Sequence, residues 1–253
     1  MRKTTRTCGV LLAASLFLTS CGETPAGPTT DTAPPESTPA APAATPSTST
    51  EPTPTIAAAK TYTNEELTAL VASLTDINGN PLTVVPAEQL DQAVAAAKAL
   101  VATATITPEA CNVFAAESTP VPDGSTYAAG ASLAAAEKTQ TTITVIAVQD
   151  LAVLADEVTA SQDAVDQCAT YEIEKDGEKI SSQVTPIEAT TDGEMSFGAL
   201  TTQSLATGEK QMIMSISGTK GTLGVTAVKI GAEIAPEAQA ELEQLINDAL
   251  AKG

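Results

Sequence analysis

Residues 169–188 read Ala-Thr-Tyr-Glu-Ile-Glu-Lys-Asp-Gly-Glu-Lys-Ile-Ser-Ser-Gln-Val-Thr-Pro-Ile-Glu, and this stretch decides the fold. At its centre, Asp176-Gly177 is a dipeptide that accepts the positive φ angles of a type I′ turn, which joins two antiparallel strands. The segments 169–175 and 178–188 on either side carry the β-branched and aromatic residues that are typical of strands. The stretch therefore predicts a β-hairpin within an antiparallel sheet.

Further strands are predicted on both sides of this hairpin. We expect them at residues 127–133, 140–149, 194–205, 211–217 and 222–230. The segment 140–149 is rich in β-branched residues, which favour strands. Gly218, Gly221 and Gly224 precede no helix, so we interpret them as hairpin and bulge glycines and not as a phosphate-binding loop. Together the segments predict an antiparallel meander.

Four other segments show the apolar periodicity of amphipathic helices. The first follows Thr63 and Glu66, which form a capping-box pattern, and the second covers residues 86–103. Asp150 is expected to cap a third helix that ends near residue 166, and Pro236 is expected to open the last. In the third helix the periodicity predicts that Leu151, Leu154, Val158 and Val165 face inward and that Asp156, Glu157 and Asp163 face outward.

Residues 61–253 are therefore expected to form one α+β domain, a twisted antiparallel sheet with helices packed mainly on one face. Aromatic residues are scarce, since the chain has three Phe, three Tyr and no Trp. Burial of Val, Leu, Ile and Ala must supply the stability of the core, at about 25 cal/mol per Å² of apolar surface.

The first 20 residues have the layout of a secretory signal peptide. Arg2, Lys3 and Arg6 precede an apolar run at residues 10–18, which is too short to span a bilayer as a helix. The sequence Leu18-Thr19-Ser20-Cys21 resembles the lipobox of bacterial lipoproteins, in which the cysteine is lipidated and becomes the new N-terminus. The resemblance implies a lipid on Cys21 that anchors the protein to the membrane. An ordinary signal peptide with a chance cysteine, or an uncleaved apolar segment, are the alternatives.

Residues 21–60 consist of the expected lipidated cysteine and a linker built mainly of Thr, Pro, Ala and Ser. Such a segment has too few large apolar residues to form a core, so we expect it to be disordered. Proline-rich chains extend toward polyproline II at about 3.1 Å per residue. The linker is therefore predicted to act as a stalk that holds the domain away from the membrane.

The chain is strongly acidic, with a net charge of −19. Removal of the signal peptide makes the charge more negative, because Arg2, Lys3 and Arg6 leave with it. Such a charge repels nucleic acid and anionic lipid surfaces, so we expect no nucleic-acid partner and contact with the membrane only through the lipid on Cys21.

Two cysteines remain for the folded domain. Cys8 lies in the signal peptide and Cys21 is expected to carry lipid, which leaves Cys111 and Cys168. An export compartment favours a disulfide between them, and two buried free thiols are the alternative. Neither lies in a CxxC motif and the chain has no His, so a zinc site or a thioredoxin-like centre is not expected.

The sequence contains no recognisable catalytic motif. The lack of His excludes Ser-His-Asp and Cys-His arrangements. Lys179 lies near Ser181 and Ser182, but a solvated strand edge explains these three residues better than a Ser-Lys dyad. The spacing Asp76-x-Asn78-x-Asn80 opens like a calcium loop, yet Pro81 stands where the glycine of such a loop belongs, so a turn is favoured. We predict that the protein is not an enzyme and that it binds no cofactor and no metal.

The order of parts resembles a known family. A lipobox, a Thr/Pro stalk, a Leu-rich helix, Cys111, a strand at residues 127–133, a helix and Cys168 occur in the same order in the extracellular sensor domain of PknH-type actinobacterial kinases and its stand-alone lipoprotein relatives. The resemblance implies an α+β domain that senses or binds an extracellular ligand. It also implies that Cys111 and Cys168 form a disulfide pair.

These observations lead to a functional hypothesis. We expect a lipid-anchored protein at the extracellular face of the membrane, with a non-enzymatic ligand-binding or sensor-like domain. Its partner is an unidentified extracellular ligand or a component of the cell wall, and the oligomeric state is open. The alternative is a cell-envelope lipoprotein that carries a lipid or glycolipid in an apolar cavity, with Met212 and Met214 among the lining residues.

Overall fold

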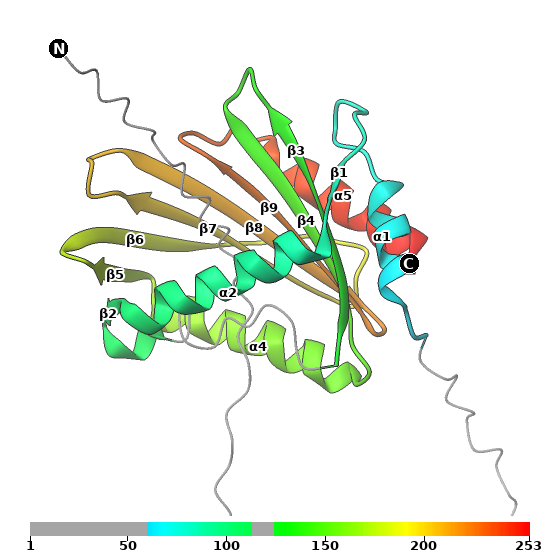
Figure 1. Ribbon diagram of the computed structural model, residues 1–253, viewed down its shortest axis with the longest axis horizontal. Helices are drawn as coiled ribbons and strands as arrows, with labels where there is room; N and C mark the ends of the chain where they lie inside the picture. Colours follow the sequence, from blue (N-terminus) through cyan, green and yellow to red (C-terminus); the bar gives the residue numbers. More distant parts are fainter. Residues whose placement is uncertain (1–59, 113–123) are drawn as a thin grey trace, which may run out of the picture. The chain divides into compact units, whose positions relative to one another are not determined.

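Nine strands form one sheet, in the order β1-β3-β4-β9-β8-β7-β6-β5-β2 (Figure 1). The computed structural model describes residues 60–112 and 124–253, so the predicted signal peptide, Cys21 and nearly all of the predicted linker lie outside the described residues. All neighbouring strands pair in antiparallel register. The strands are β1 (Thr83–Val85), β2 (Thr105–Thr107), β3 (Thr126–Ala134), β4 (Thr139–Ala147), β5 (Thr170–Lys175), β6 (Glu178–Ile187), β7 (Met195–Ser204), β8 (Lys210–Lys220) and β9 (Leu223–Gly231).

The β5–β6 hairpin forms where the sequence predicts it. Asp176 and Gly177 have φ angles of 54° and 81°, the left-handed region that a type I′ turn requires. Lys175 pairs with Glu178 directly beside this turn. The predicted antiparallel meander is therefore confirmed, and the turn residues determine its register in this hairpin.

Four described helices accompany the sheet, and all four were predicted. They are α1 (Asn64–Ala72), α2 (Ala87–Thr103), α4 (Leu151–Gln167) and α5 (Ala238–Lys252), with a short 3-10 helix η1 (Glu109–Asn112) that carries Cys111. The capping box of α1 is present, since the Glu66 N–H donates to the Thr63 hydroxyl and the Thr63 N–H donates to the Glu66 carboxylate. None of the helices in residues 60–112 and 124–253 has the length and apolarity to cross a bilayer.

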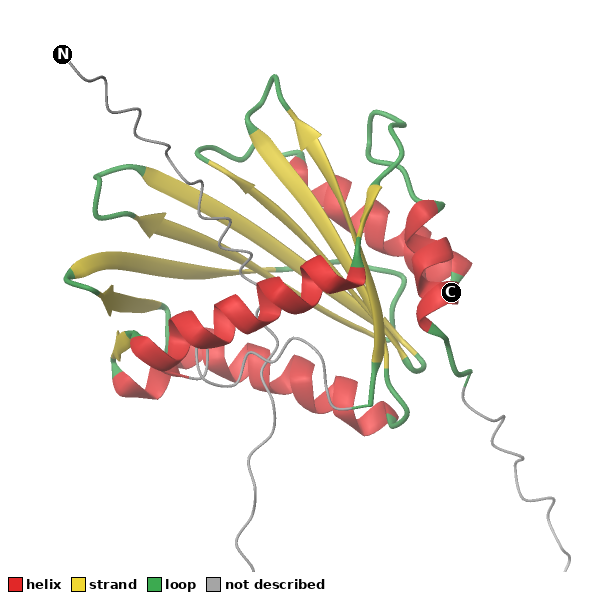
Figure 2. Cartoon of the chain, viewed as in Figure 1, coloured by secondary structure: helices red, strands yellow, loops and turns green. Residues whose placement is uncertain are grey.

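The helices lie on both faces of the sheet, which refines the expectation that they pack mainly on one face (Figure 2). Successive residues of a strand point to opposite faces, so β4 presents Ile143 and Val145 to one face and Ile146 to the other. The first face packs against α1 and α5 in the main core, where Val71, Leu242 and Ile246 are fully buried. Ile146 packs against Leu154 of α4 on the second face. The predicted α+β class is confirmed.

A disulfide joins η1 to the end of α4. Cys111 and Cys168 are bonded, with their Cα atoms 5.7 Å apart, and both are buried. They form a second core cluster with residues of β2, β5, β6 and β7, among them Tyr171 and Val184. The predicted disulfide is confirmed, and the alternative of two free thiols is wrong.

Two residues of α4 lie opposite to their predicted sides. Leu151, expected to face inward, is 48% exposed, and Glu157, expected to face outward, is only 6% exposed. Residues three and four apart share a helix face, so Glu157 belongs to the face of Leu154, Val158 and Ser161. The prediction placed Glu157 in solvent because its side chain is charged. Its position in the helix instead places it on the face that packs against the sheet.

Candidate functional site

A polar pocket of about 270 Å³ lies between α5, the turn after α1, and the β3–β4 hairpin. Residues 75–79 form one wall and the exposed side of α5 forms another. Ser132 and Thr141 of the hairpin strands add hydroxyl groups, and Gln244 of α5 adds an amide. The pocket therefore offers many hydrogen-bonding groups in a small volume.

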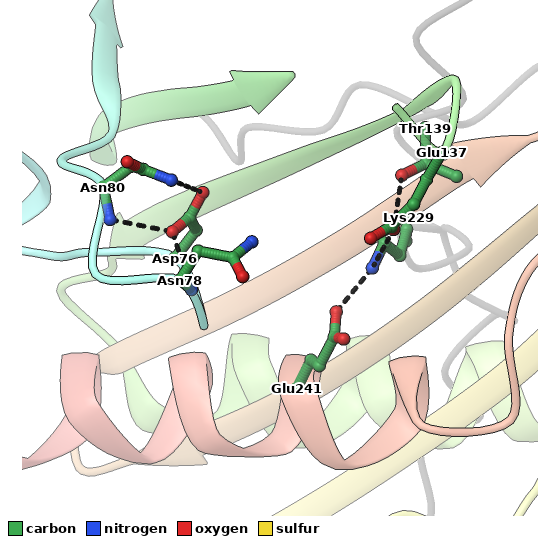
Figure 3. A network of polar contacts seen from close by, with 7 residues as sticks. All are labelled: Asp76, Asn78, Asn80, Glu137, Thr139, Lys229 and Glu241. Carbon is green, nitrogen blue, oxygen red and sulfur yellow. Dashed lines mark hydrogen bonds and ion pairs between the residues drawn. The ribbon is translucent and has the colours of Figure 1, made fainter. Parts of the chain in front are cut away.

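Lys229 of β9 lies at the centre of the polar contacts in this pocket (Figure 3). It is 5% exposed, and its Nζ donates a short hydrogen bond to Glu241 Oε2 of α5. A second carboxylate, from Glu137 in the β3–β4 turn, lies 3.9 Å from Nζ. A buried ammonium is costly unless carboxylates pair with it, so these two contacts explain why Lys229 is tolerated there.

The strand position of Lys229 places it in the pocket. Val225, Ala227 and Lys229 alternate along β9 and face the same side, toward α5. Val225 and Ala227 are buried in the main core, so Lys229 lies where that core meets the pocket. A lysine on the apolar side of a strand is a signal that the sequence contained, and our sequence analysis missed it together with Glu241.

Asp76 shapes the turn that forms one wall of the pocket (Figure 3). Its Oδ1 accepts hydrogen bonds from the N–H groups of Asn78 and Asn80, each at 2.9 Å, and its Oδ2 accepts from the Asn80 side-chain amide at 3.2 Å. The predicted turn is therefore confirmed, because both carboxylate oxygens of Asp76 accept hydrogen bonds from residues of the turn itself. Residues 60–112 and 124–253 hold no group of three or more side chains placed to bind a metal ion.

The charge of the pocket is predominantly negative. Asp76, Glu137, Glu241 and Asp248 line it, against the single cation Lys229. At the rim, Ile77 is 57% exposed. This combination suits a small polar ligand that presents a cationic group beside an apolar one.

Two smaller cavities lie on the other face of the sheet, between α4 and the strands. They measure about 20 and 40 Å³ and share Ser161, Phe197 and Ser217. Glu157 lines the smaller cavity, and burial raises the pKa of its carboxyl to about 7. Tyr171 lines the larger one, and burial likewise raises the pKa of its hydroxyl.

The remaining residues singled out in the sequence lie apart from these cavities. Lys179 is exposed and pairs with Glu174 at 3.5 Å, so the solvated-edge interpretation is confirmed for this lysine. It is wrong for Ser182, which is only 4% exposed. Met214 is buried in the main core and lines neither cavity beneath α4. Cys21, the predicted lipidation site, lies outside the described residues.

Among the comparisons with known proteins, the comparison with solved structures gives matches. No protein-family model matches the chain, and no curated protein matches it significantly. The structure is similar to the extracellular domain of PknH from Mycobacterium tuberculosis, with 12% identity and a TM-score of 0.48, covering 77% of this chain and 99% of that chain. It is also similar to an uncharacterized protein of Mycobacterium smegmatis, an Rv0999 ortholog, with 14% identity and a TM-score of 0.41, covering 68% of this chain and 85% of that one.

Proposed function

We propose that this protein is a lipid-anchored lipoprotein at the extracellular face of the membrane, and that its domain is a non-enzymatic binding module. Its ligand is a small polar molecule with a cationic group, and its site is the pocket around Lys229. The observation that carries the binding proposal is the pocket itself, with its paired buried lysine and its excess of carboxylates.

The way the chain enters the domain supports this arrangement. The Lys60 carbonyl accepts a hydrogen bond from the Thr222 hydroxyl, and the Tyr62 carbonyl accepts one from Thr126. Thr222 lies just before β9 begins, whereas Lys229 lies near its other end, roughly 20 Å away at the rise of a strand. The described chain therefore enters the domain beside the start of β9, at the end of that strand away from Lys229.

The pocket is sized for a small ligand. Its volume of about 270 Å³ is slightly below the range of roughly 300–1,000 Å³ that is typical of small-molecule sites. Lys229 and Glu241 are already paired. Asp248, an exposed residue of α5, has no hydrogen-bond or ion-pair partner among residues 60–112 and 124–253. We expect Asp248 to contact the cationic group of the ligand.

Ligand binding can be tested by thermal denaturation of the mature protein with a panel of small amines, amino acids and soluble cell-wall fragments. A ligand that binds the folded state raises the melting temperature in a concentration-dependent manner. Asp248→Asn removes one charge-assisted hydrogen bond to the ligand. We therefore expect this variant to need about ten times more ligand for the same rise in melting temperature. Asp163→Asn, an exposed carboxylate on α4, is the matched control. A panel without any stabilising compound, or equal effects of both variants, would contradict the proposal.

The lipid-carrier alternative finds little support in the apolar cavities of the domain. Those beneath α4 hold about 20 and 40 Å³, enough for a water-sized group and not for an acyl chain. The pocket of larger volume is lined mostly by polar side chains. Extraction followed by mass spectrometry distinguishes the two functions, because a lipid bound in stoichiometric amount would favour the carrier.

A further inference from the structure

The ammonium of Lys229 has hydrogen-bonding capacity that the described residues leave unused (Figure 3). A lysine Nζ carries three N–H donors. One of them donates to Glu241 Oε2, whereas Glu137, at 3.9 Å, lies too far away for a hydrogen bond. No other residue in 60–112 or 124–253 accepts from this nitrogen, although the lysine side chain is only 6% exposed. The remaining N–H donors of a buried cation are therefore available to an acceptor in the pocket.

The carboxylate of Glu137, which approaches Lys229 from the β3–β4 turn, is loosely held. Its side chain is 59% exposed, and its one hydrogen bond within the described residues comes from the Thr139 hydroxyl at 3.5 Å. Ion pairs of such exposed side chains contribute little free energy, so Glu137 can turn away from Lys229 at little cost. A carboxylate of a ligand can then take its place and come within hydrogen-bonding distance of Nζ.

Helix α5 supplies further polar groups in a row along the pocket. Glu241, Gln244 and Asp248 all line it, and residues three and four apart share one face of a helix. Gln244 and Asp248 are exposed, and neither has a side-chain partner in the part of the chain that the structure describes. The row therefore runs from the Lys229–Glu241 pair, through an amide, to an unpaired carboxylate.

The length of this row limits the ligand. The seven residues from Glu241 to Asp248 span about 10 Å of helix. A charge-assisted hydrogen bond of about 2.8 Å at each end leaves about 5 Å between the two charges of the ligand. The nitrogen and the carboxyl carbon of a single α-amino acid lie only about 2.5 Å apart, whereas the two Cα atoms of a dipeptide alone are about 3.8 Å apart. The row is therefore spaced for a molecule of dipeptide size.

We propose that the ligand of this pocket is a zwitterion of dipeptide size, an inference that rests on the binding function proposed above. Its carboxylate accepts hydrogen bonds from Lys229, its ammonium binds Asp248, and the Gln244 amide contacts the peptide group between them. A simple anion would be repelled by the carboxylates that line the pocket, and a simple cation would leave the donors of Lys229 empty. A zwitterion satisfies both ends of the row.

Calorimetric titration of the mature protein with alanyl-alanine, as the L,L and the D,D stereoisomer, tests this proposal. We expect at least one stereoisomer to bind. Its C-terminal amide should bind at least about tenfold more weakly, because it lacks the carboxylate that Lys229 would contact. Its N-acetyl form should lose a similar factor, because it lacks the ammonium that Asp248 would contact.

Glu137→Gln gives an effect of the opposite sign. This variant removes the negative charge that competes with the ligand carboxylate for Lys229, so it should bind the dipeptide roughly threefold more tightly and should not bind the amide more tightly. The matched control is Glu209→Gln, an exposed glutamate of another turn whose Oε2 likewise accepts from a threonine hydroxyl, that of Thr207 at 3.3 Å. It should leave both affinities unchanged.

The outcomes separate this inference from the function on which it rests. An amide that binds as tightly as its dipeptide would overturn the zwitterion and leave the site for cationic ligands in place. Weaker dipeptide binding by Glu137→Gln would also overturn it, because Glu137 would then attract the ligand. The same conclusion follows if neither stereoisomer binds while a simple amine stabilises the protein. A protein that no compound stabilises would contradict the proposed function itself, and this inference with it.

Discussion

At the scale of single residues, Lys229 is a buried cation that lies between two carboxylates. It lies on the core-facing side of β9, and its ammonium is held by Glu241 and approached by Glu137. Buried ion pairs contribute little net stability, yet removal of one partner leaves the other charge in a poorly solvated place. The pair therefore determines the shape of the pocket more than it stabilises the fold.

Lys229→Met should destabilise the protein by about 2–3 kcal/mol, because Glu241 then loses its partner while its side chain is only 22% exposed. The double variant Lys229→Met/Glu241→Leu should recover most of this loss, since no charge remains unpaired. Urea denaturation measures both free energies of unfolding. The matched control is Lys179→Met, whose pairs are exposed and should contribute no more than about 0.5 kcal/mol. Equal effects at positions 229 and 179 would contradict this account of the pocket.

At the scale of elements, the disulfide joins η1 and the end of α4 across 57 residues of sequence. A cross-link over such a loop lowers the entropy of the unfolded chain. The same bond packs with Ile106 of β2 and Tyr171 of β5, so it also contributes to the second core cluster. We therefore expect it to stabilise the edge of the sheet formed by β2 and β5.

Replacement of both cysteines, Cys111→Ala/Cys168→Ala, should lower the free energy of unfolding by about 2–4 kcal/mol. Chemical denaturation with and without a reductant gives the measurement. The reductant should bring the wild type close to the double variant and leave the double variant unchanged. Wild-type stability that survives verified reduction of both thiols would show that the cross-link contributes nothing.

The elements also show which parts of the fold can be predicted from the sequence. The β5–β6 hairpin was predictable because Asp176-Gly177 specifies its turn locally, and α1 because Thr63 and Glu66 cap it. Strands β1 and β2 were missed because three residues carry no periodicity, and they form by pairing with β3 and β5. The site was missed for a related reason, since Lys229, Glu137 and Asp76 are far apart in sequence and line one pocket only in the folded domain, although the position of Lys229 on the apolar side of its strand was a local signal.

At the scale of the whole molecule, the strong negative charge and the predicted lipid act in opposite directions. The net charge of −19 repels an anionic membrane surface, so electrostatic attraction cannot hold this protein there. A single acyl chain gives only marginal and reversible membrane binding, and stable anchoring takes a second one or a basic patch. Because an acidic protein gains nothing from a basic patch, we expect at least two acyl chains on the N-terminal cysteine.

Cys21→Ser should therefore move the protein from the membrane fraction to the medium. In the wild type, mass spectrometry of the N-terminal peptide should find Cys21 as the first residue, with an added mass of at least two acyl chains, and high salt should not release the protein. The control is Cys111→Ala/Cys168→Ala, which loses the other two cysteines of the exported chain and should stay with the membrane. Recovery of wild-type protein from the medium with no fatty acid on Cys21 would refute the anchor. The pocket around Lys229 would then belong to a free extracellular protein, and its ligand binding would need to be tested on that form.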